Sequence, residues 1–310
     1  MRRHGSSAAM AQIILDNLSP GRLLMLGDAA LQSRDADLAL GLYTAALRAT
    51  DGSLTLRLHN RIGLARSPNP RTLATLEVLQ KLENHEKVFV GEGLATWQKT
   101  LPFMEDERFM GLVEKHADLL PLANWHWNLN TVLWAVHQAK DLPGDFVELG
   151  VFKGHTTIFA AEYVQFAEWG RRWVLYDTFD GIPDDQVDAG WATVNQNTYR
   201  GHFSYEEVRD RFSEFPNIDV VKGRVPEILR ETCPEQIAFI HMDLNNVSAE
   251  IAALDVLYDR ITPGGVIVFD DYGWAVSRLQ FEAENAWFAD RGLKILACPT
   301  GQGLFVKPAA

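Results

Sequence analysis

The stretch GDFVELGVFKGHTT, from Gly144 to Thr157, decides the fold. It starts with a short apolar run that ends on the carboxylate of Glu148. Gly150 and Gly154 follow, four residues apart, before a run with a helical pattern begins. A strand that passes through a glycine turn into a helix is the opening unit of an α/β sheet, and such turns commonly bind ligands. The stretch therefore predicts an α/β fold with a binding site at this turn.

Six further apolar runs follow, and the pattern alternates between strand and helix. They cover residues 171–177, 218–223, 237–243, 264–271, 293–299 and 303–308. Helical stretches separate the first six of the seven runs, whereas only TGQ joins the last two, which is typical of a hairpin. Continuous apolar runs indicate parallel strands buried on both faces. The sequence thus predicts an open, doubly wound, mostly parallel α/β sheet of seven strands.

The chain before this sheet has a helical pattern. Ser19 and Pro20 are typical of a helix start, and residues 21–53 predict two helices around a polar turn at Arg34-Asp35. Their small and aromatic residues have the spacing of one tetratricopeptide unit, although an ordinary helical hairpin fits as well. Prolines in 65–72 and the segment DLPG at 141–144 mark linkers. We therefore expect a tetratricopeptide-like region at 1–68, a helical bridge on the substrate side at 69–142 and the α/β domain at 143–310.

The composition excludes several classes of protein. Of the 310 residues, 47% are hydrophobic and 23% charged, and the net charge is −12, so no nucleic acid is expected as a partner. No run approaches the about 18 apolar residues of a membrane span, and residues 1–18 lack the apolar segment of a signal peptide. We expect a cytoplasmic protein without membrane contact. Cys233 and Cys298, with no C-x-x-C, predict idle thiols rather than a zinc site or a disulfide framework.

Carboxylates stand at four of the five parallel strand ends, where ligands bind in such sheets. The ends carry Glu148, Asp177, Lys222-Gly223, Asp243 and Asp270-Asp271. A strand end has no structural need for acidic residues, so we expect this edge of the sheet to hold the functional site.

The glycine turn indicates which cofactor would bind. A dinucleotide turn needs G-x-G-x-x-G, but Phe152 stands at the middle glycine, which disfavours an NAD-dependent oxidoreductase. The turn suits a ligand without phosphate: Gly150 and Gly154 would leave room for a thin chain, and Glu148 would take an ammonium group. Asp177 would accept the hydroxyls of a ribose, although DTFDGIP is also a good turn sequence.

An ammonium group and a ribose without a phosphate indicate S-adenosylmethionine. We expect its adenine to lie beside the exit of the third strand, at Gly223 and Arg224. The complete set of residues predicted to bind this cofactor is Glu148, Gly150, Gly154, Thr157, Asp177, Thr178, Gly223, Arg224 and Asp243.

Asp243, Asp270 and Asp271 predict a metal site. They are separated by one βαβ crossover, so adjacent strand tips would bring them together. Three like charges repel unless a cation neutralises them, and hard oxygen ligands favour Mg²⁺. A helix cap would explain one of these aspartates but not the set. A metal here would activate a hydroxyl for methyl transfer, with Asp243 as the base and His155 and His202 as weaker candidates.

At this point the residues resemble a known family, the macrocin O-methyltransferase (TylF/MycF-type) family. The segments that carry the resemblance are GDFVELGVFKG, YDTFDGIP, IAFIHMD and GGVIVFDDYG, within Gly144 to about Lys307. The resemblance implies a class I, Rossmann-like methyltransferase that uses S-adenosylmethionine and magnesium to methylate a sugar hydroxyl. It also implies that Asp243, Asp270 and Asp271 hold the metal and that Asp243 is the base.

The sequence departs from this family after Asp243. Many relatives have an acidic residue two places on and then an aromatic one, where this chain has Asn245 and Asn246. Catechol-type methyltransferases share the layout but have a lysine where Asn246 stands. The connection between the second and third strands is long, and we expect 191–202 to fold over the substrate, the alternative being a disordered excursion. Ser204 and Glu207 form a capping box that starts the next helix.

Three readings of function follow. The leading one is an O-methyltransferase for a sugar or glycosylated metabolite. The alternatives are a catechol or phenol O-methyltransferase, and a non-catalytic protein that binds adenosylmethionine and docks to a partner through its first helices. Apolar helix faces in the first third also predict a homo-oligomer.

Overall fold

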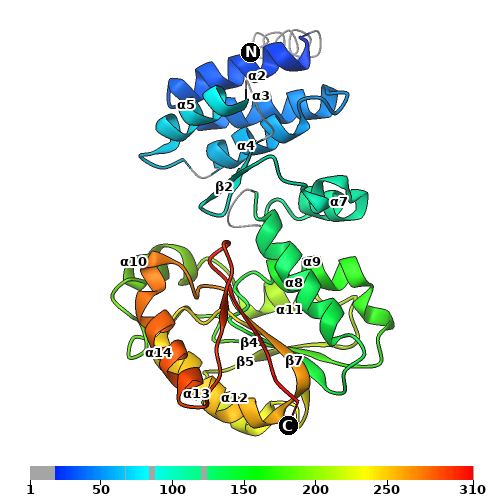
Figure 1. Cartoon of the computed structure of the whole chain (residues 1–310), viewed down its shortest axis with the longest axis vertical. Coiled ribbons are helices and arrows are strands. Elements are labelled where there is room, and N and C mark those ends of the chain that lie inside the picture. Colours follow the sequence, from blue (N-terminus) through cyan, green and yellow to red (C-terminus); the bar gives the residue numbers. More distant parts are fainter. Residues whose placement is uncertain (1–17, 67, 84–87, 120–123, 310) are drawn as a thin grey trace, which may run out of the picture. The chain divides into compact units, whose positions relative to one another are not determined.

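The computed structural model describes residues 18–66, 68–83, 88–119 and 124–309 (Figure 1). The expectation about a signal peptide concerns residues outside this part. The described chain forms two compact units, one of residues up to Pro102 with 124–126, the other of 103–119 with the described residues from Trp127 onward. The three predicted regions, with boundaries at 68 and 142, stay a prediction about domains.

The second unit contains the predicted sheet. Its strand order is β5-β4-β3-β6-β7-β9-β8, with parallel pairing from β5 to β7 and antiparallel pairing of β9 with β7 and β8. The strands are β3 (Asp145–Leu149), β4 (Trp173–Asp177), β5 (Ile218–Lys222), β6 (Ile237–Met242), β7 (Ile261–Phe269), β8 (Leu296–Ala297) and β9 (Gly303–Val306). The prediction of a doubly wound, mostly parallel seven-stranded sheet is confirmed.

Helices cover both faces of this sheet. The α-helices from Pro102 onward are α6 (Pro102–Glu105), α7 (Glu107–Lys115), α8 (His126–Ala139), α9 (His155–Val164), α10 (Ala192–Val194), α11 (Tyr205–Arg211), α12 (Glu227–Thr232), α13 (Val247–Leu257) and α14 (Arg278–Ala289). On one face, Val147 and Leu149 of β3 belong to a core cluster with residues of α12, α13 and α14. On the other, the ring of Phe146 contacts those of Trp173, Phe239 and Phe166. Alternation along β3 therefore places Glu148 on the face of Phe146.

Within the described residues, the first unit contains four helices and a hairpin. They are α2 (Pro20–Gln32), α3 (Ala36–Ala49), α4 (Thr55–Arg66), α5 (Thr72–Glu83), β1 (Val88–Gly91) and β2 (Leu94–Trp97). The predicted helix start at Ser19-Pro20 and the turn at Arg34-Asp35 are where the sequence placed them. The hairpin was not predicted, because it lies within 69–142, where we expected a helical bridge. The apolar side chain of Met25 in α2 is 69% exposed. Docking or self-association through these helices stays a prediction.

A buried ionic network ties the helices of the first unit together. Arg61 of α4 pairs with Asp28 of α2 at 2.8 Å and with Glu83 of α5 at 2.6 Å. Tyr43 of α3 donates a hydrogen bond to the same Asp28. One guanidinium therefore neutralises two buried carboxylates from different helices.

No helix within the described ranges is long and apolar enough to cross a membrane.

Replacing Arg61 with methionine is expected to destabilise the protein strongly. Methionine fills a similar volume but leaves Asp28 and Glu83 buried without a cation, which costs about 3–5 kcal/mol. Denaturant unfolding measures the change. The control is Lys81→Met, which removes an exposed pair with Glu77 and should cost no more than about 1 kcal/mol. Equal effects of the two variants would contradict the role given to Arg61.

Candidate active site

Three carboxylates converge at the carboxyl edge of the sheet. Asp243 follows β6, and Asp270 and Asp271 follow β7, the neighbouring strand. One oxygen from each residue lies within 4.8 Å of the others. Asp270 is buried, whereas Asp243 and Asp271 are partly exposed. This is the only such cluster of three or more metal-ligating side chains in the part of the chain that the structure describes.

The cluster is electrostatically unfavourable on its own. Burial and the charges of Asp270 and Asp271 raise the pKa of Asp243 well above its usual value. Burial and the charges of Asp270 and Glu250 likewise raise the pKa of Asp271. A divalent cation among these oxygens would remove the repulsion, and carboxylate oxygens are the ligands that Mg²⁺ prefers. The residues present therefore fit such an ion.

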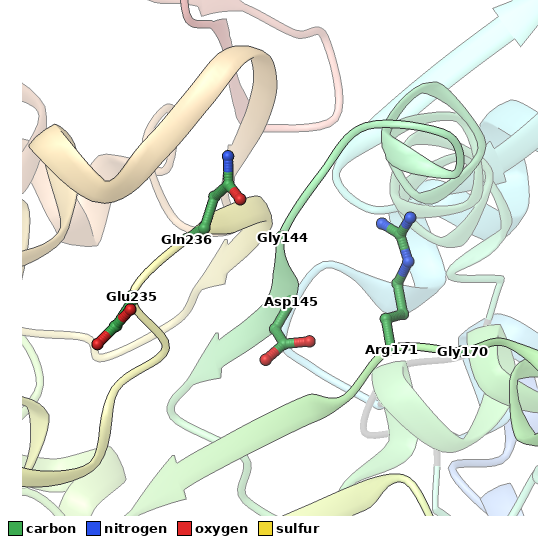
Figure 2. Close-up of a pocket in the computed structure, with 6 residues that line it drawn as sticks. All are labelled: Gly144, Asp145, Gly170, Arg171, Glu235 and Gln236. Carbon is green, nitrogen blue, oxygen red and sulfur yellow. The ribbon is translucent and has the colours of Figure 1, made fainter.

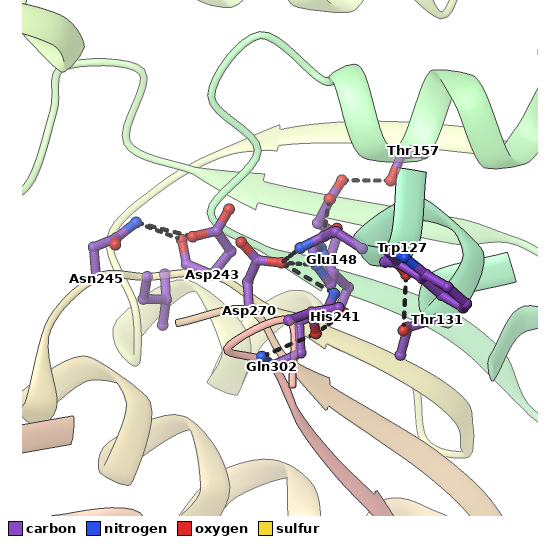
Figure 3. A network of polar contacts seen from close by, with 12 residues as sticks. Trp127, Thr131, Glu148, Thr157, His241, Asp243, Asn245, Asp270 and Gln302 are labelled. Atoms are coloured by element: carbon purple, nitrogen blue, oxygen red, sulfur yellow. Dashed lines mark hydrogen bonds and ion pairs between the residues drawn. The ribbon is translucent and has the colours of Figure 1, made fainter. Parts of the chain in front are cut away.

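A buried histidine connects this cluster to β3 (Figure 3). Glu148 and His241 are register partners on β3 and β6, and His241 Nδ1 lies 2.9 Å from Glu148 Oε1. On the other side, His241 Nε2 lies 3.5 Å from Asp270 Oδ1. Burial acts against the charged ring, but the neighbouring carboxylates of Asp270 and Glu148 raise the pKa of His241 to about 10. This pKa favours an imidazolium between the two carboxylates.

Asp270 is held by further contacts. Asn128 of α8 donates to Asp270 Oδ1 at 2.8 Å, and Gln302 donates to the same oxygen at 3.3 Å. Burial acts to raise the pKa of Asp270, but the hydrogen bond and charge of His241 outweigh it and lower that pKa. Sequence reasoning missed all three of these supporting residues. A signal existed for His241 alone, since it is the single polar residue in the apolar strand IAFIHM.

Glu148 has other partners than the predicted ammonium group. Thr157 donates to Glu148 Oε2, His241 contacts Oε1, and the side chain is only 1% exposed. The sequence interpretation placed the carboxylate beside an open turn, whereas the structure buries it. Its contact with a cofactor stays an untested prediction, and the packing supports a role in holding His241.

Asp177 fixes the glycine turn. Its Oδ2 accepts hydrogen bonds from the backbone N–H groups of Val151 and Phe152 at 2.7 and 2.9 Å, and its Oδ1 accepts one from Phe179 at 2.7 Å. Phe152 and Phe179 both have left-handed backbones, with φ of 48° and 53°. The carboxylate thus stabilises two strained turns at once. These bonds agree with the interpretation of Asp177 as a turn residue. Its contact with a ribose stays a prediction.

The glycines of the turn are required by the protein's own packing. A Cβ on Gly150 would lie 1.9 Å from the backbone oxygen of Asp243, and one on Gly154 would lie 2.8 Å from the ring of Phe212. Both residues also have left-handed backbones, with φ of 81° and 74°. Gly223 similarly faces the side chain of Ile228, at 2.6 Å. Close packing accounts for these glycines, so their spacing alone is no proof of a bound ligand.

The remaining predicted cofactor residues lie around the same edge. Thr178 donates to the carbonyl of Gly181 at 2.6 Å. Arg224, with a side chain 40% exposed, pairs with Asp185 at 2.6 Å. Binding of the cofactor by Thr178 and Arg224 stays a prediction.

The segment 191–202 is folded rather than extended. It contains α10 and the π-helix Asn195–Tyr199, and Asn195 exchanges two hydrogen bonds with the backbone of Ile182. Trp191 donates to Gln280 of α14 at 3.0 Å. Burial and the nearby charges of Asp243 and Asp271 raise the pKa of Tyr199, so this segment approaches the carboxylates. The predicted capping box of Ser204 and Glu207 is confirmed.

The weaker base candidates differ in environment. His155 is buried at the start of α9, and burial lowers its pKa to about 4, which makes it neutral at physiological pH. His202 is exposed. The geometry therefore favours neither of them over Asp243.

A cavity of about 470 Å³ lies at the other end of the strands (Figure 2). Its lining residues are Gly144, Asp145, Gly170, Arg171, Glu235 and Gln236. These residues precede or begin β3, β4 and β6, so the cavity is at the amino edge of the sheet. The arginine is already engaged, because it donates to the backbone oxygens of Ala139 and Leu142. The cavity is therefore separate from the acidic cluster.

The strand order and the position of the acidic cluster define a class I, Rossmann-like methyltransferase fold. A solved structure titled "Structure of the O-methyltransferase NovP" has the same fold, with a TM-score of 0.51 and 21% identity over 59% of this chain and 80% of that chain. Residues 126–291 match the family model for Macrocin-O-methyltransferase (TylF). The chain belongs to this family.

Two curated relatives resemble part of the chain. One is the 8-demethyl-8-(2,3-dimethoxy-alpha-L-rhamnosyl)-tetracenomycin-C 4'-O-methyltransferase of Streptomyces olivaceus, 28% identical over 49% of this chain and 59% of its own length. Another is the Mycinamicin III 3''-O-methyltransferase of Micromonospora griseorubida, 30% identical over 46% of this chain and 62% of its own length. The similarity thus spans about three fifths of these relatives.

Proposed function

We propose that this protein is an O-methyltransferase that uses S-adenosylmethionine and a divalent cation to methylate a hydroxyl of a sugar or glycosylated metabolite. The observation that carries the proposal is the convergence of Asp243, Asp270 and Asp271 at the carboxyl edge of the sheet. Membership of the macrocin O-methyltransferase family supports methyl transfer to oxygen. The names of two relatives, which act on a rhamnosyl compound and on mycinamicin, support a glycosylated acceptor.

Two neighbouring groups of residues would form a cation site and a site for the methyl donor. Asp243, Asp270 and Asp271 would hold the cation, with Asn128, His241 and Gln302 fixing Asp270. Bound Mg²⁺ would supply Lewis acidity, which lowers the pKa of an acceptor hydroxyl. Asp243 would accept the proton of that hydroxyl because of its position. It follows β6, which lies between β3, the strand before the glycine turn, and β7, the strand before Asp270 and Asp271.

On the donor side, the turn between β3 and α9 would hold S-adenosylmethionine, which supplies the methyl group. Asp177 is only partly buried, and each carboxylate oxygen can accept two hydrogen bonds. Its Oδ1 accepts a short bond from the N–H of Phe179 and a long one, at 3.5 Å, from the hydroxyl of Thr178, which a ribose hydroxyl would replace. Positioning of the acceptor oxygen in line with the methyl group would provide most of the rate enhancement.

Tritiated methyl transfer tests this function. The full chain with Mg²⁺ should label a nucleotide sugar or a glycosylated natural product, lose activity with a chelator and regain it when Mg²⁺ is restored. Labelling only of phenols or catechols would overturn the acceptor class. Turnover unaffected by the chelator would overturn the role of the three aspartates. Binding of the cofactor with no turnover of any acceptor class would favour the non-catalytic alternative.

A further inference from the structure

Asn245 occupies an unusual position beside the acidic cluster. It lies in the turn between β6 and α13, with a left-handed backbone (φ 58°) and a side chain 6% exposed. Its Nδ2 donates a hydrogen bond to Asp243 Oδ1 at 2.9 Å. Figure 3 shows Asn245 on the side of Asp243 away from Asp270. The amide therefore contacts the carboxylate that the proposed function uses twice, as ligand and as base.

The orientation of this amide follows from its neighbours. An ionised carboxylate only accepts hydrogen bonds, and so does the backbone oxygen of Asp243, 3.5 Å from the same Nδ2. The NH₂ group must therefore face Asp243, which leaves Asn245 Oδ1 as the other end of the amide. That oxygen is buried and has no hydrogen-bond partner among the described residues. A buried polar atom left unsatisfied costs about 1–3 kcal/mol.

The neighbouring Asn246 shows the contrast. Its Oδ1 accepts from the N–H of Ala249 as the cap of α13, and its Nδ2 donates to the backbone oxygen of Leu244. Both ends of that amide are used for folding. Asn245 uses only one end, and the unused oxygen is next to a group predicted to bind a cation.

We propose that Asn245 is a positioning residue of the cation site, an inference that rests on the proposed function. Its Nδ2 holds the carboxylate of Asp243 in the orientation that a cation ligand needs. Groups that orient metal ligands typically contribute 10- to 100-fold to metal affinity.

One substitution tests this hydrogen bond. Asn245→Gly removes the side chain without backbone strain, since glycine adopts positive φ freely. It should weaken Mg²⁺ binding about tenfold, measured by calorimetry on the full chain with Mg²⁺ alone.

The matched control is Asn124→Gly. Asn124 has the same φ of 58° and the same 6% exposure, but it belongs to the first compact unit and donates to the backbone of Val90. This variant should bind Mg²⁺ as the unchanged protein does. The affinity for S-adenosylmethionine should be the same in both variants, which excludes general unfolding.

Each outcome has a distinct meaning. Unchanged Mg²⁺ affinity in Asn245→Gly would overturn the inference. If the unchanged protein binds no Mg²⁺, the metal-dependent function itself fails, and the inference with it.

Discussion

Replacing Asp271 with asparagine is expected to lower kcat at least about a hundredfold and, at the same time, to raise the melting temperature of the metal-free protein. The loss of activity follows because a cation contributes several kcal/mol of transition-state stabilisation and needs its carboxylate ligands. The gain in stability follows because burial, Asp270 and Glu250 already disfavour the charged form of Asp271. A neutral side chain of the same shape removes that repulsion, so the metal-free protein should melt at a higher temperature.

The two opposite signs make this test specific. Steady-state kinetics measures kcat, and thermal unfolding without Mg²⁺ measures the stability. Asp290→Asn serves as the control, since it removes an exposed carboxylate at the end of α14 and should change neither quantity. The affinity for S-adenosylmethionine should be the same in both variants. A variant that loses activity and stability together would indicate that Asp271 supports the fold instead.

The positions of the three aspartates were predictable from sequence for a simple physical reason. In a parallel sheet, the carboxyl ends of neighbouring strands share one edge, so residues one crossover apart meet there. Asp243 and Asp270 satisfy this rule, because β6 and β7 are neighbours in the sheet. The apolar runs gave the strands themselves, since strands buried on both faces leave an unmistakable pattern.

The partners of these residues could not be predicted in the same way. Sequence places Glu148 at a strand end but does not show that β3 lies beside β6, in the register that puts His241 opposite it. That pairing joins residues 93 positions apart and decides whether the carboxylate is open or buried. Asp177 is similar, because its bonds to Val151 and Phe152 depend on the path of the turn. Spacing predicts the edge of the sheet, but not the rotamers and charge pairs at it.

The hairpin of the first unit was missed for a related reason. Val88–Gly91 and Leu94–Trp97 are each four residues long, too short for a period to be distinguished. Contacts distant in sequence hold them, including the bond from Asn60 Nδ2 to the carbonyl of Val88. Arg61 was likewise invisible as a core residue, since a buried arginine is identified by its carboxylate partners and not by its neighbours in sequence.

Replacing His241 with phenylalanine is expected to reduce the free energy of unfolding by about 3–5 kcal/mol, the cost of leaving buried charges unpaired. Phenylalanine fills the space of the ring but leaves Glu148 and Asp270 without the cation between them. Both carboxylates are buried, so water cannot replace it. His241→Gln is the matched variant, because a neutral amide can still donate to one of the two carboxylates, and its loss should be smaller.

The pH dependence identifies the charge as the cause. The folded-state pKa of His241 is raised to about 10 from an ordinary value of 6.5. The stability due to its charge is therefore complete below about pH 6.5 and is lost as the pH rises toward 10. Between pH 7 and 10, denaturant unfolding should show the unchanged protein losing this stability, while His241→Phe loses none from this group, so the two curves converge. Parallel curves would show that His241 acts through packing alone, and then the imidazolium between Glu148 and Asp270 could not be what holds Asp270 in the cation site.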